Sequence, residues 1–267
     1  TQPIPTKPAP YETLGVTIDD LVDFTPEIRA QAVTAVADFQ LGPVFNPPLQ
    51  RNHPSGKVAP MICPAGAVNI THPTVADPTT GVMYVVSNSR CSYRQIVPGE
   101  EADTYYNAPT GVTLSRYAAA RGGPTPRHPL NIPLLKPPYS RITAIDMNTG
   151  EHLWVIPTGE TPQRIKDLPE LRSVDIGNTG TGNAVPALVT ANMLLYADVT
   201  SDGTPHLFAV DKASGQEIGR IEVPATSRYG MSTWIHEGHQ YIILQTASKL
   251  TALALPDAID LGGGGSH

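Results

Sequence analysis

Apolar and polar residues alternate along two stretches of the chain, 141–154 and 206–219, that share one pattern. In both stretches an alanine stands two residues before an aspartate, and a glycine stands four residues after that aspartate. Residues 77–81 repeat the turn alone, with the sequence Asp-Pro-Thr-Thr-Gly. The alternation is typical of half-buried strands, and the aspartate and glycine favour a tight turn between them. A unit that recurs in this way predicts stacked β-hairpins, as in a β-propeller.

The remaining pattern predicts one clear helix and a series of further strands. The helical segment is expected at 24–41, with Thr25 as its N-cap, Pro26 at the first helical position and Ile28 on its apolar face. A short polar helix is expected at 161–168. Strands are expected as a pair within 65–90 around the first turn, and then at 140–146, 151–157, 184–188, 193–198, 205–210, 216–223, 231–236, 240–245 and 249–254.

The spacing of the turns indicates how many repeats the chain holds. The aspartates at the turns, Asp77, Asp146 and Asp211, lie 69 and 65 residues apart, whereas a minimal propeller blade takes ~40–45 residues. We interpret the difference as loop insertions between blades, so that the chain amounts to about four blades. Residues 91–138 have few periodic apolar positions, and they form either a functional insertion or a plain surface excursion.

Composition agrees with an all-β, loop-rich protein. Of 267 residues, 40% are hydrophobic and 16% charged, and the 28 prolines and 23 glycines exceed ordinary usage. The net charge of −6 argues against nucleic acid or an anionic membrane surface as a partner. No signal peptide is evident, so the sequence is expected to be a mature or a cytosolic one. Residues 262–267 have the composition of a linker and tag remnant, which leaves 1–261 for the fold.

Few residues match the motifs of known catalytic or metal sites. Cys63 and Cys91 flank the first turn, and they form either a disulfide or a pair of free buried thiols. His236 and His239 are three residues apart around a glycine, which indicates a hairpin turn and not the helical zinc motif. Neither a Gly-x-Ser-x-Gly elbow nor a Walker loop occurs.

Several stretches in order resemble one family: 5–10, 23–29, 77–85, 135–146, 178–183 and 236–241. They are similar to the C-terminal half of the quinoprotein dehydrogenases, which depend on pyrroloquinoline quinone (PQQ). The nearest branch contains membrane-bound glucose dehydrogenase and the related polyol and alcohol dehydrogenases. The resemblance implies an eight-bladed propeller, of which this chain supplies about half, with PQQ on its axis beside Ca²⁺. It also implies a periplasmic location, either free or associated with the inner membrane through a further segment or a partner, and electron transfer to a quinone or a cytochrome.

The chain departs from this family in ways that bear on its activity. It has about half the expected length, and the resemblance places the catalytic Asp and the main metal ligands in the absent half. The segment 65–72 lacks the tryptophan that relatives carry near the quinone, and Gly219 stands where the second repeat should have a docking tryptophan. Ala247-Ser248-Lys249 replaces a glycine-rich loop. We therefore expect a complementary N-terminal propeller chain or a second copy as partner.

The resemblance also points to cofactor-binding candidates. The run 178–183 has glycines that permit close approach and side chains that donate hydrogen bonds, so it forms either a PQQ contact or a structural turn between blades. A lysine before two prolines either pairs with a cofactor carboxylate or is a solvated loop residue. The candidates are Asn69, His72, Lys136, Thr181, Gly182, Asn183 and Asp202.

Two functions from different classes fit these observations. The chain is either part of an oxidoreductase that oxidises a small alcohol, polyol or sugar with PQQ, or a non-catalytic propeller-derived module for binding or assembly. The ordered family motifs favour the first function, and the lost tryptophans favour the second.

Overall fold

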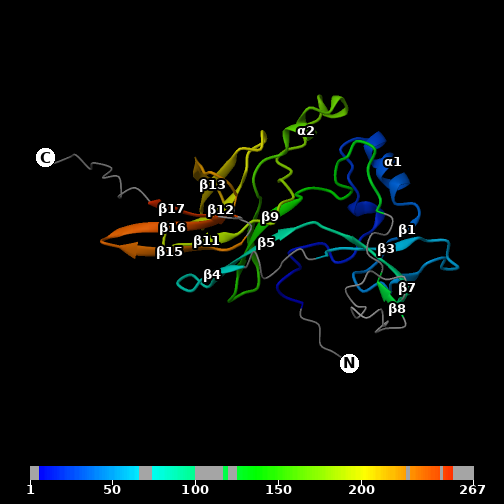
Figure 1. Cartoon of the computed structure of the whole chain (residues 1–267), viewed down its shortest axis with the longest axis horizontal. Coiled ribbons are helices and arrows are strands. Elements are labelled where there is room, and N and C mark those ends of the chain that lie inside the picture. Colours follow the sequence, from blue (N-terminus) through cyan, green and yellow to red (C-terminus); the bar gives the residue numbers. More distant parts are fainter. Residues whose placement is uncertain are drawn as a thin grey trace.

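The structure is a computed structural model that describes residues 6–65, 74–99, 117–119, 125–226, 229–246 and 249–254. Three sheets follow one another through one part of the molecule, and the N-terminal helix with two small sheets occupies the other part (Figure 1). Within the described residues, no helix has the length and hydrophobicity needed to span a membrane.

The first sheet combines two hairpins. Its strands are β4 (Val75–Asp77), β5 (Val82–Asn88), β9 (Ser140–Asp146) and β10 (His152–Pro157). They are antiparallel neighbours in the order β10-β9-β5-β4. The interpretation of the spacing between Asp77 and Asp146 as a distance between blades is therefore wrong. β5 pairs with β9 along its whole length, so both turns belong to one sheet. The long connection from 89 to 139 separates the two hairpins in sequence but not in space.

The turns have the predicted chemistry. Asp77 Oδ1 accepts hydrogen bonds from the Thr79 amide at 2.9 Å and from the Thr79 hydroxyl at 2.6 Å. Gly81 follows with a φ of 71°, which is the left-handed region that glycine adopts without strain. Asp146 and Asp211 accept amide hydrogen bonds in the same way. The Asp-to-Gly pattern therefore stabilises the turn between two strands, and these aspartates are turn residues as predicted.

The second and third sheets follow in chain order. The second consists of β11 (Ala187–Val189), β12 (Met193–Val199), β13 (Pro205–Asp211) and β14 (Glu217–Glu222). The third consists of β15 (Met231–His236), β16 (His239–Thr246) and β17 (Lys249–Ala254). All neighbours within both sheets are antiparallel, and the strands agree with the predicted ranges to within a few residues.

The three sheets are packed face to face. Along β12, Leu194 and Tyr196 point into the core shared with the first sheet, where they meet Ile142. Leu195, between them, points into the core shared with the third sheet, where it meets Ile242. The period-two alternation therefore buries side chains on both faces of β12. This confirms the predicted array of stacked sheets.

Trp154 of β10 packs between the first sheet and the second. Its Nε1 donates to the carbonyl oxygen of Lys212 at 3.1 Å, and its ring centroid lies 5.6 Å from that of Tyr84. A Cβ added to Gly215 would lie 2.9 Å from the indole, so only glycine fits beneath it. The equivalent position in the second sheet, Gly219, is exposed, and a Cβ there would meet no described residue within 4 Å. The first repeat therefore has a docking tryptophan, and the second does not.

A second core forms around the N-terminal helix α1 (Pro26–Ala35). The side chain of Thr25 accepts from the Ile28 amide at 3.2 Å, which confirms the predicted N-cap. The helix ends earlier than predicted because β1 (Phe39–Gln40) pairs in parallel with β3 (Ala59–Ile62). The predicted face is otherwise correct, since Ile28 packs into this core.

The connection between β5 and β9 packs against the same core. Its strands are β6 (Ser92–Tyr93), β7 (Gln95–Pro98) and β8 (Tyr117–Ala119), and β7 also pairs with β2 (Leu49–Gln50). The helix α2 (Gln163–Lys166) and two 3₁₀ turns, Ile18–Asp20 and Pro169–Leu171, complete this region. Cys63 and Cys91 form a disulfide with a Cα–Cα distance of 4.5 Å, which decides between the two alternatives for these cysteines.

Candidate functional site

The candidate residues that the structure describes come from loops at one end of the stacked sheets. The Asp-to-Gly turns after β4, β9 and β13 lie at the opposite end, because neighbouring strands are antiparallel. The loop end is formed where β5, β10 and β12 finish and β9, β11 and β13 begin. Three connections meet there: 158–162 after β10, 178–186 before β11, and 200–204 after β12.

The run 178–183 forms a tight turn that lies against β9. The side chain of Asn178 accepts from the Gly180 amide at 3.0 Å and donates to the carbonyl oxygen of Gly159 at 2.8 Å. A Cβ added to Gly180 would lie 2.7 Å from the backbone oxygen of Ser140, and its φ is 69°. Glycine is therefore required here for close approach between two backbone segments. Of the two alternatives for 178–183, this role of Gly180 agrees with a structural turn.

The next residues of the turn are held by a buried carboxyl group, that of Asp198 at the end of β12. Thr181 donates its hydroxyl to Asp198 Oδ2 at 2.7 Å, and the Asn183 amide group donates to Oδ1 at 2.9 Å. The Val199 amide donates to Oδ1 as well, at 2.9 Å. Asp198 is 0% exposed, and this burial raises its pKa against the opposing effect of these hydrogen bonds.

Two further hydroxyls tie the turn to the first sheet. Ser140 Oγ accepts from the Gly182 amide at 3.0 Å and from the Thr158 hydroxyl at 2.7 Å. Both Ser140 and Thr158 are fully buried. The turn is thus fastened on one side by β9 and on the other by β12, and its position depends on the packing of the first two sheets.

One side of the turn remains open toward solvent. Asn183 is exposed, and among the described residues its side-chain amide is hydrogen-bonded to Asp198. The amide keeps a second N–H and its oxygen for a ligand. Among the described residues, a Cβ added to Gly182 would meet only Tyr139, at 3.6 Å, and Gly182 itself presents no side chain to the open side. The geometry therefore offers a small neutral set of hydrogen-bond groups.

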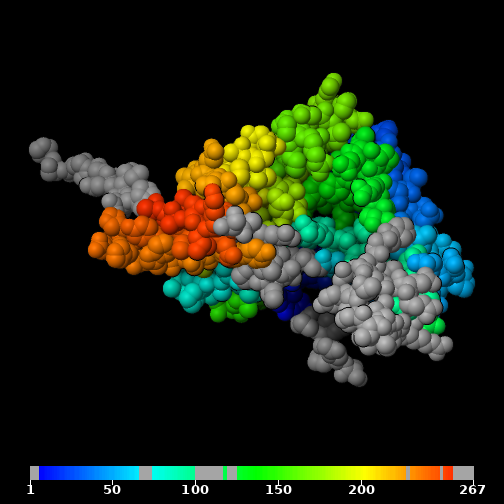
Figure 2. All heavy atoms as spheres, in the orientation of Figure 1, coloured from blue at the N-terminus to red at the C-terminus, as the bar shows by residue number. Residues whose placement is uncertain are grey.

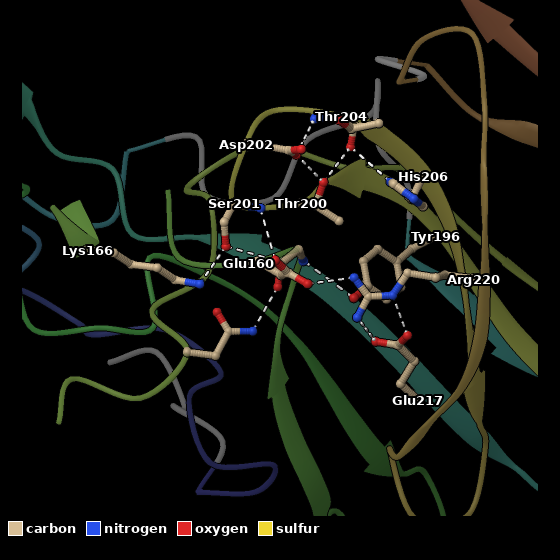
Figure 3. Close-up of polar contacts among 12 residues, drawn as sticks. Glu160, Lys166, Tyr196, Thr200, Ser201, Asp202, Thr204, His206, Glu217 and Arg220 are labelled. Carbon is tan, nitrogen blue, oxygen red and sulfur yellow. Dashed lines mark hydrogen bonds and ion pairs between the residues drawn. The ribbon is translucent and has the colours of Figure 1, made fainter. Parts of the chain in front are cut away.

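Asp202 lies in the neighbouring loop and belongs to a turn of its own. Its Oδ1 accepts the Thr200 hydroxyl at 2.7 Å and the Thr204 amide at 3.0 Å (Figure 3). These hydrogen bonds, that of Thr200 first, lower the pKa of Asp202 to about 2. His206 follows, with Nδ1 3.0 Å from the Thr204 carbonyl oxygen. This arrangement agrees with the interpretation of Asp202 as a turn residue.

A polar hollow of about 540 Å³ lies beside this loop. Glu160 forms one wall, where its carboxylate accepts from the Ser201 hydroxyl at 2.8 Å and from Arg220 Nη1 at 2.6 Å (Figure 3). The guanidinium of Arg220, followed by the Ser201 hydrogen bonds, lowers the pKa of Glu160 to about 2. The lining residues are Glu160, Gln163, Thr200, Ser201, Asp202, Thr204, His206 and Glu222.

The other predicted candidates are not part of this group. The ammonium of Lys136 lies 2.8 Å from Asp23 Oδ2, so it forms an ion pair with the segment before α1. Its loop nevertheless reaches the turn, because the Tyr139 amide donates to the carbonyl oxygen of Thr179 at 2.7 Å. Asn69 and His72 lie outside the described residues. In the ranges that the structure describes, no three His, Cys, Asp or Glu side chains come together as metal ligands.

The sequence interpretation missed Asp198. Its signal is nonetheless visible, because a carboxyl group near the end of the apolar stretch 193–199 is unusual in a core strand. The hydroxyls of Ser140 and Thr158 gave no such signal, since both are common residues at strand ends. Thr181, Gly182 and Asn183 were found, together with the turn that carries them.

Comparison with known proteins identifies the family. Residues 1–242 match the family described as "PQQ: Glucose/ethanol/alcohol dehydrogenase, beta-propeller domain". The chain belongs to this family. The predicted relationship to the PQQ-dependent quinoproteins is thereby confirmed, as is the all-β fold of propeller type.

Individual relatives are similar over part of their length. The chain is 29% identical over 136 residues to the large subunit of glycerol dehydrogenase from Gluconobacter thailandicus, covering 46% of this chain and 18% of that protein. It is 26% identical over 164 residues to quinoprotein glucose dehydrogenase from Escherichia coli strain K12, covering 58% and 19%. A solved structure, quinohemoprotein alcohol dehydrogenase from Comamonas testosteroni, is 17% identical with a TM-score of 0.39, covering 77% of this chain and 28% of that one. The matches therefore span about a fifth of these curated relatives.

Replacing Asp198 by asparagine is expected to reduce the dependence of stability on pH. Because burial raises the pKa of Asp198, the folded state binds this proton more tightly than the unfolded state does. The resulting stabilisation is complete below the unfolded pKa and is lost as the pH rises through the folded pKa. The asparagine side chain does not titrate, so the variant should not lose stability as the pH rises through this range. Urea unfolding from about pH 4 to about pH 8 measures it.

The control for this experiment is Asp175→Asn. Asp175 is exposed and accepts a hydrogen bond from the Gly177 amide at 3.0 Å. This variant should keep the slope of the parent protein. A parental slope in Asp198→Asn as well would show that Asp198 does not titrate with a raised pKa.

Proposed function

We propose that this chain is part of a PQQ-dependent dehydrogenase that oxidises a small alcohol, polyol or aldose. The observation that carries the proposal is the match of residues 1–242 to the PQQ propeller family. The relatives named glycerol dehydrogenase and glucose dehydrogenase act on polyols and sugars by their names, and they support the substrate class. Electrons would pass onward to a quinone or a cytochrome.

The turn that ends at Asn183 fits one edge of PQQ. PQQ has carbonyl and carboxylate oxygens, which accept hydrogen bonds, and the exposed Asn183 amide keeps an N–H to donate. Gly182 leaves room for a planar ring to approach. The ammonium of Lys136 is paired with Asp23, so the cationic partners of the PQQ carboxylates would come from the rest of the propeller.

In this proposal the chain binds and orients the cofactor. When bound, PQQ supplies the redox chemistry by accepting hydride from the substrate carbon. Asn183 would hold one edge of the ring by hydrogen bonding, and the packed sheets behind the turn would keep that edge fixed. The carboxylate that takes the substrate proton, and most ligands of the Ca²⁺ ion, would lie in the remaining part of the protein.

A partner surface is available on the third sheet, which lies at one side of the molecule (Figure 2). Trp234 and Tyr241 are directly opposite each other on β15 and β16, with stacked rings 5.1 Å apart. On the same face of this sheet, Leu250 of β17 is 69% exposed. Exposed sheet faces of this kind are typical of interfaces. We propose that a complementary propeller chain, or a second copy, packs here.

The periplasm is the cellular compartment that agrees best with the disulfide of this chain. The Cys63–Cys91 disulfide favours an oxidising environment, and the bacterial periplasm is one. The disulfide is thus the structural feature that supports this part of the proposal.

The alternative function, a non-catalytic binding or assembly module, is favoured by one observation. Gly219 leaves the outer strand β14 without a docking tryptophan, and all residues of β14 are exposed. A propeller with a weakened outer strand would still bind a partner. The two functions differ in whether the assembled protein binds PQQ and oxidises substrate.

The proposed function predicts that the full chain, together with its complementary part, binds PQQ in the presence of Ca²⁺. Quinone absorbance after gel filtration measures binding, and reduction of an artificial electron acceptor measures turnover. The panel contains alcohols, polyols and aldoses, and samples without PQQ are the control. Retention of PQQ with turnover of one substrate class is the expected result. Absence of both PQQ retention and turnover across the panel would refute the proposal and favour the binding module.

A further inference from the structure

Asp198 is a buried carboxyl group to which the proposed mechanism assigns no role. It is 0% exposed at the end of a core strand, and it accepts hydrogen bonds from Thr181, Asn183 and Val199. Among the described residues, no ion pair includes it. Burial of a carboxyl group without a cation has a large free-energy cost. An apolar side chain would fill the same place without that cost.

The geometry shows what this carboxyl group does. Its two oxygens hold two side chains of one turn, the Thr181 hydroxyl on Oδ2 and the Asn183 amide on Oδ1. Thr181 in turn accepts from the Asn183 backbone amide at 3.1 Å. The Asn183 side chain is therefore fixed in position by one hydrogen bond and its backbone by another.

The carboxyl group is itself held firmly. A Cβ added to Gly159 would lie 2.8 Å from Asp198 Oδ2 and 2.6 Å from the Thr181 methyl group. The chain thus approaches the carboxyl group more closely than any other residue at 159 would allow. A fixed carboxyl group gives its hydrogen-bonded neighbours a fixed orientation.

We propose that Asp198 is the positioning residue of the cofactor-facing turn, and that it holds the Asn183 amide in the orientation in which that amide meets PQQ. The inference rests on the proposed function, because it concerns how this turn meets the cofactor. Asp198 acts through Asn183 and does not touch the ligand. Without the carboxyl group, Asn183 rotates freely, and PQQ binding must also restrict that rotation.

The test is a double-mutant cycle on the affinity of the assembled full-chain protein for PQQ, measured by titration of quinone absorbance. Asp198→Ala and Asn183→Ala should each weaken PQQ binding by about tenfold. The double variant should be little weaker than either single variant, because both changes remove the same oriented amide. Asp198→Asn should stay within about threefold of the parent, because its amide oxygen still accepts from Asn183.

Two further variants keep the result interpretable. Asp198→Val fills the core space without accepting a hydrogen bond, and it replaces Asp198→Ala in the cycle where that variant does not fold. Asp175→Ala removes an exposed aspartate that bonds the backbone just before the same turn, and it should leave PQQ affinity unchanged.

The outcomes separate the inference from the proposed function. If the parent protein binds PQQ and the folded Asp198 variants bind it equally well, the inference is refuted and the proposed function stands. Single effects that multiply in the double variant would also refute it, because Asp198 would then act through general stability. If the parent protein does not bind PQQ, the proposed function fails and the inference fails with it.

Discussion

Replacing Trp154 by alanine is expected to lower the free energy of unfolding by about 3 kcal/mol. The indole lies at the junction of the first two sheets, over Gly215 and beside Tyr84, and it donates to the Lys212 carbonyl oxygen at 3.1 Å. Alanine would leave a cavity between the sheets and remove one of two donors to the Lys212 carbonyl oxygen, which also accepts from the Tyr84 hydroxyl at 3.4 Å. Urea denaturation, followed by far-ultraviolet circular dichroism, measures the loss.

The chain has only two tryptophans, so Trp234 is a matched control. Trp234 is 39% exposed on the third sheet and stacks on Tyr241. Its replacement by alanine should cost less than about 1 kcal/mol, because it opens no cavity between sheets. Trp154→Phe should give an intermediate loss, since it keeps a ring over Gly215 and removes the hydrogen bond. Equal losses for Trp154→Ala and Trp234→Ala would show that Trp154 does not lock the two sheets.

The strands and turns could be predicted from the sequence because their causes are local. The hydrogen bonds of Asp77 to Thr79 join residues two positions apart, and the left-handed Gly81 follows at once. The alternation along 193–199 shows which residues share a face. Such short-range causes are visible in any stretch of sequence that is long enough to hold the turn and its strands.

The assignment of strands to sheets could not be predicted in the same way. The pairing of β5 with β9 joins Val82 to Asp146 and Asn88 to Ser140, across a long connection. A repeated turn motif does not show whether two copies lie in one sheet or in two. The free energy of a sheet depends on partners distant in sequence, and spacing alone led to the wrong blade boundary. The end of α1 was misplaced for a similar reason, because β1 forms only by pairing with β3.

The candidate site shows the same division. Thr181 and Asn183 were found because glycines and hydrogen-bonding side chains in one short run form a recognisable turn. The group that holds them, Asp198, comes from the following strand, and the sequence does not show which carboxyl group the turn will meet. Lys136 was predicted as a candidate, and its partner Asp23 lies in a distant part of the chain. Interactions across space therefore decide which candidates come together.

Removal of the disulfide by the double change Cys63→Ser and Cys91→Ser is expected to lower the free energy of unfolding by about 3.5 kcal/mol. The two cysteines are 28 residues apart, so the bond restricts the unfolded chain over a loop of that length. Cys63 is buried in the core around α1, and it directly follows β3. Urea denaturation of the oxidised parent and of the double variant measures the difference.

A reductant provides the control for this prediction. Added to the parent protein during unfolding, it should lower the denaturation midpoint to that of the double variant, and it should leave the double variant unchanged. This pattern separates the loss of the cross-link from any effect of the serine side chains. A parent protein whose midpoint is the same with and without reductant would contradict a stabilising Cys63–Cys91 bond. It would also remove the structural support for an oxidising compartment, because free thiols are the normal state in the cytosol.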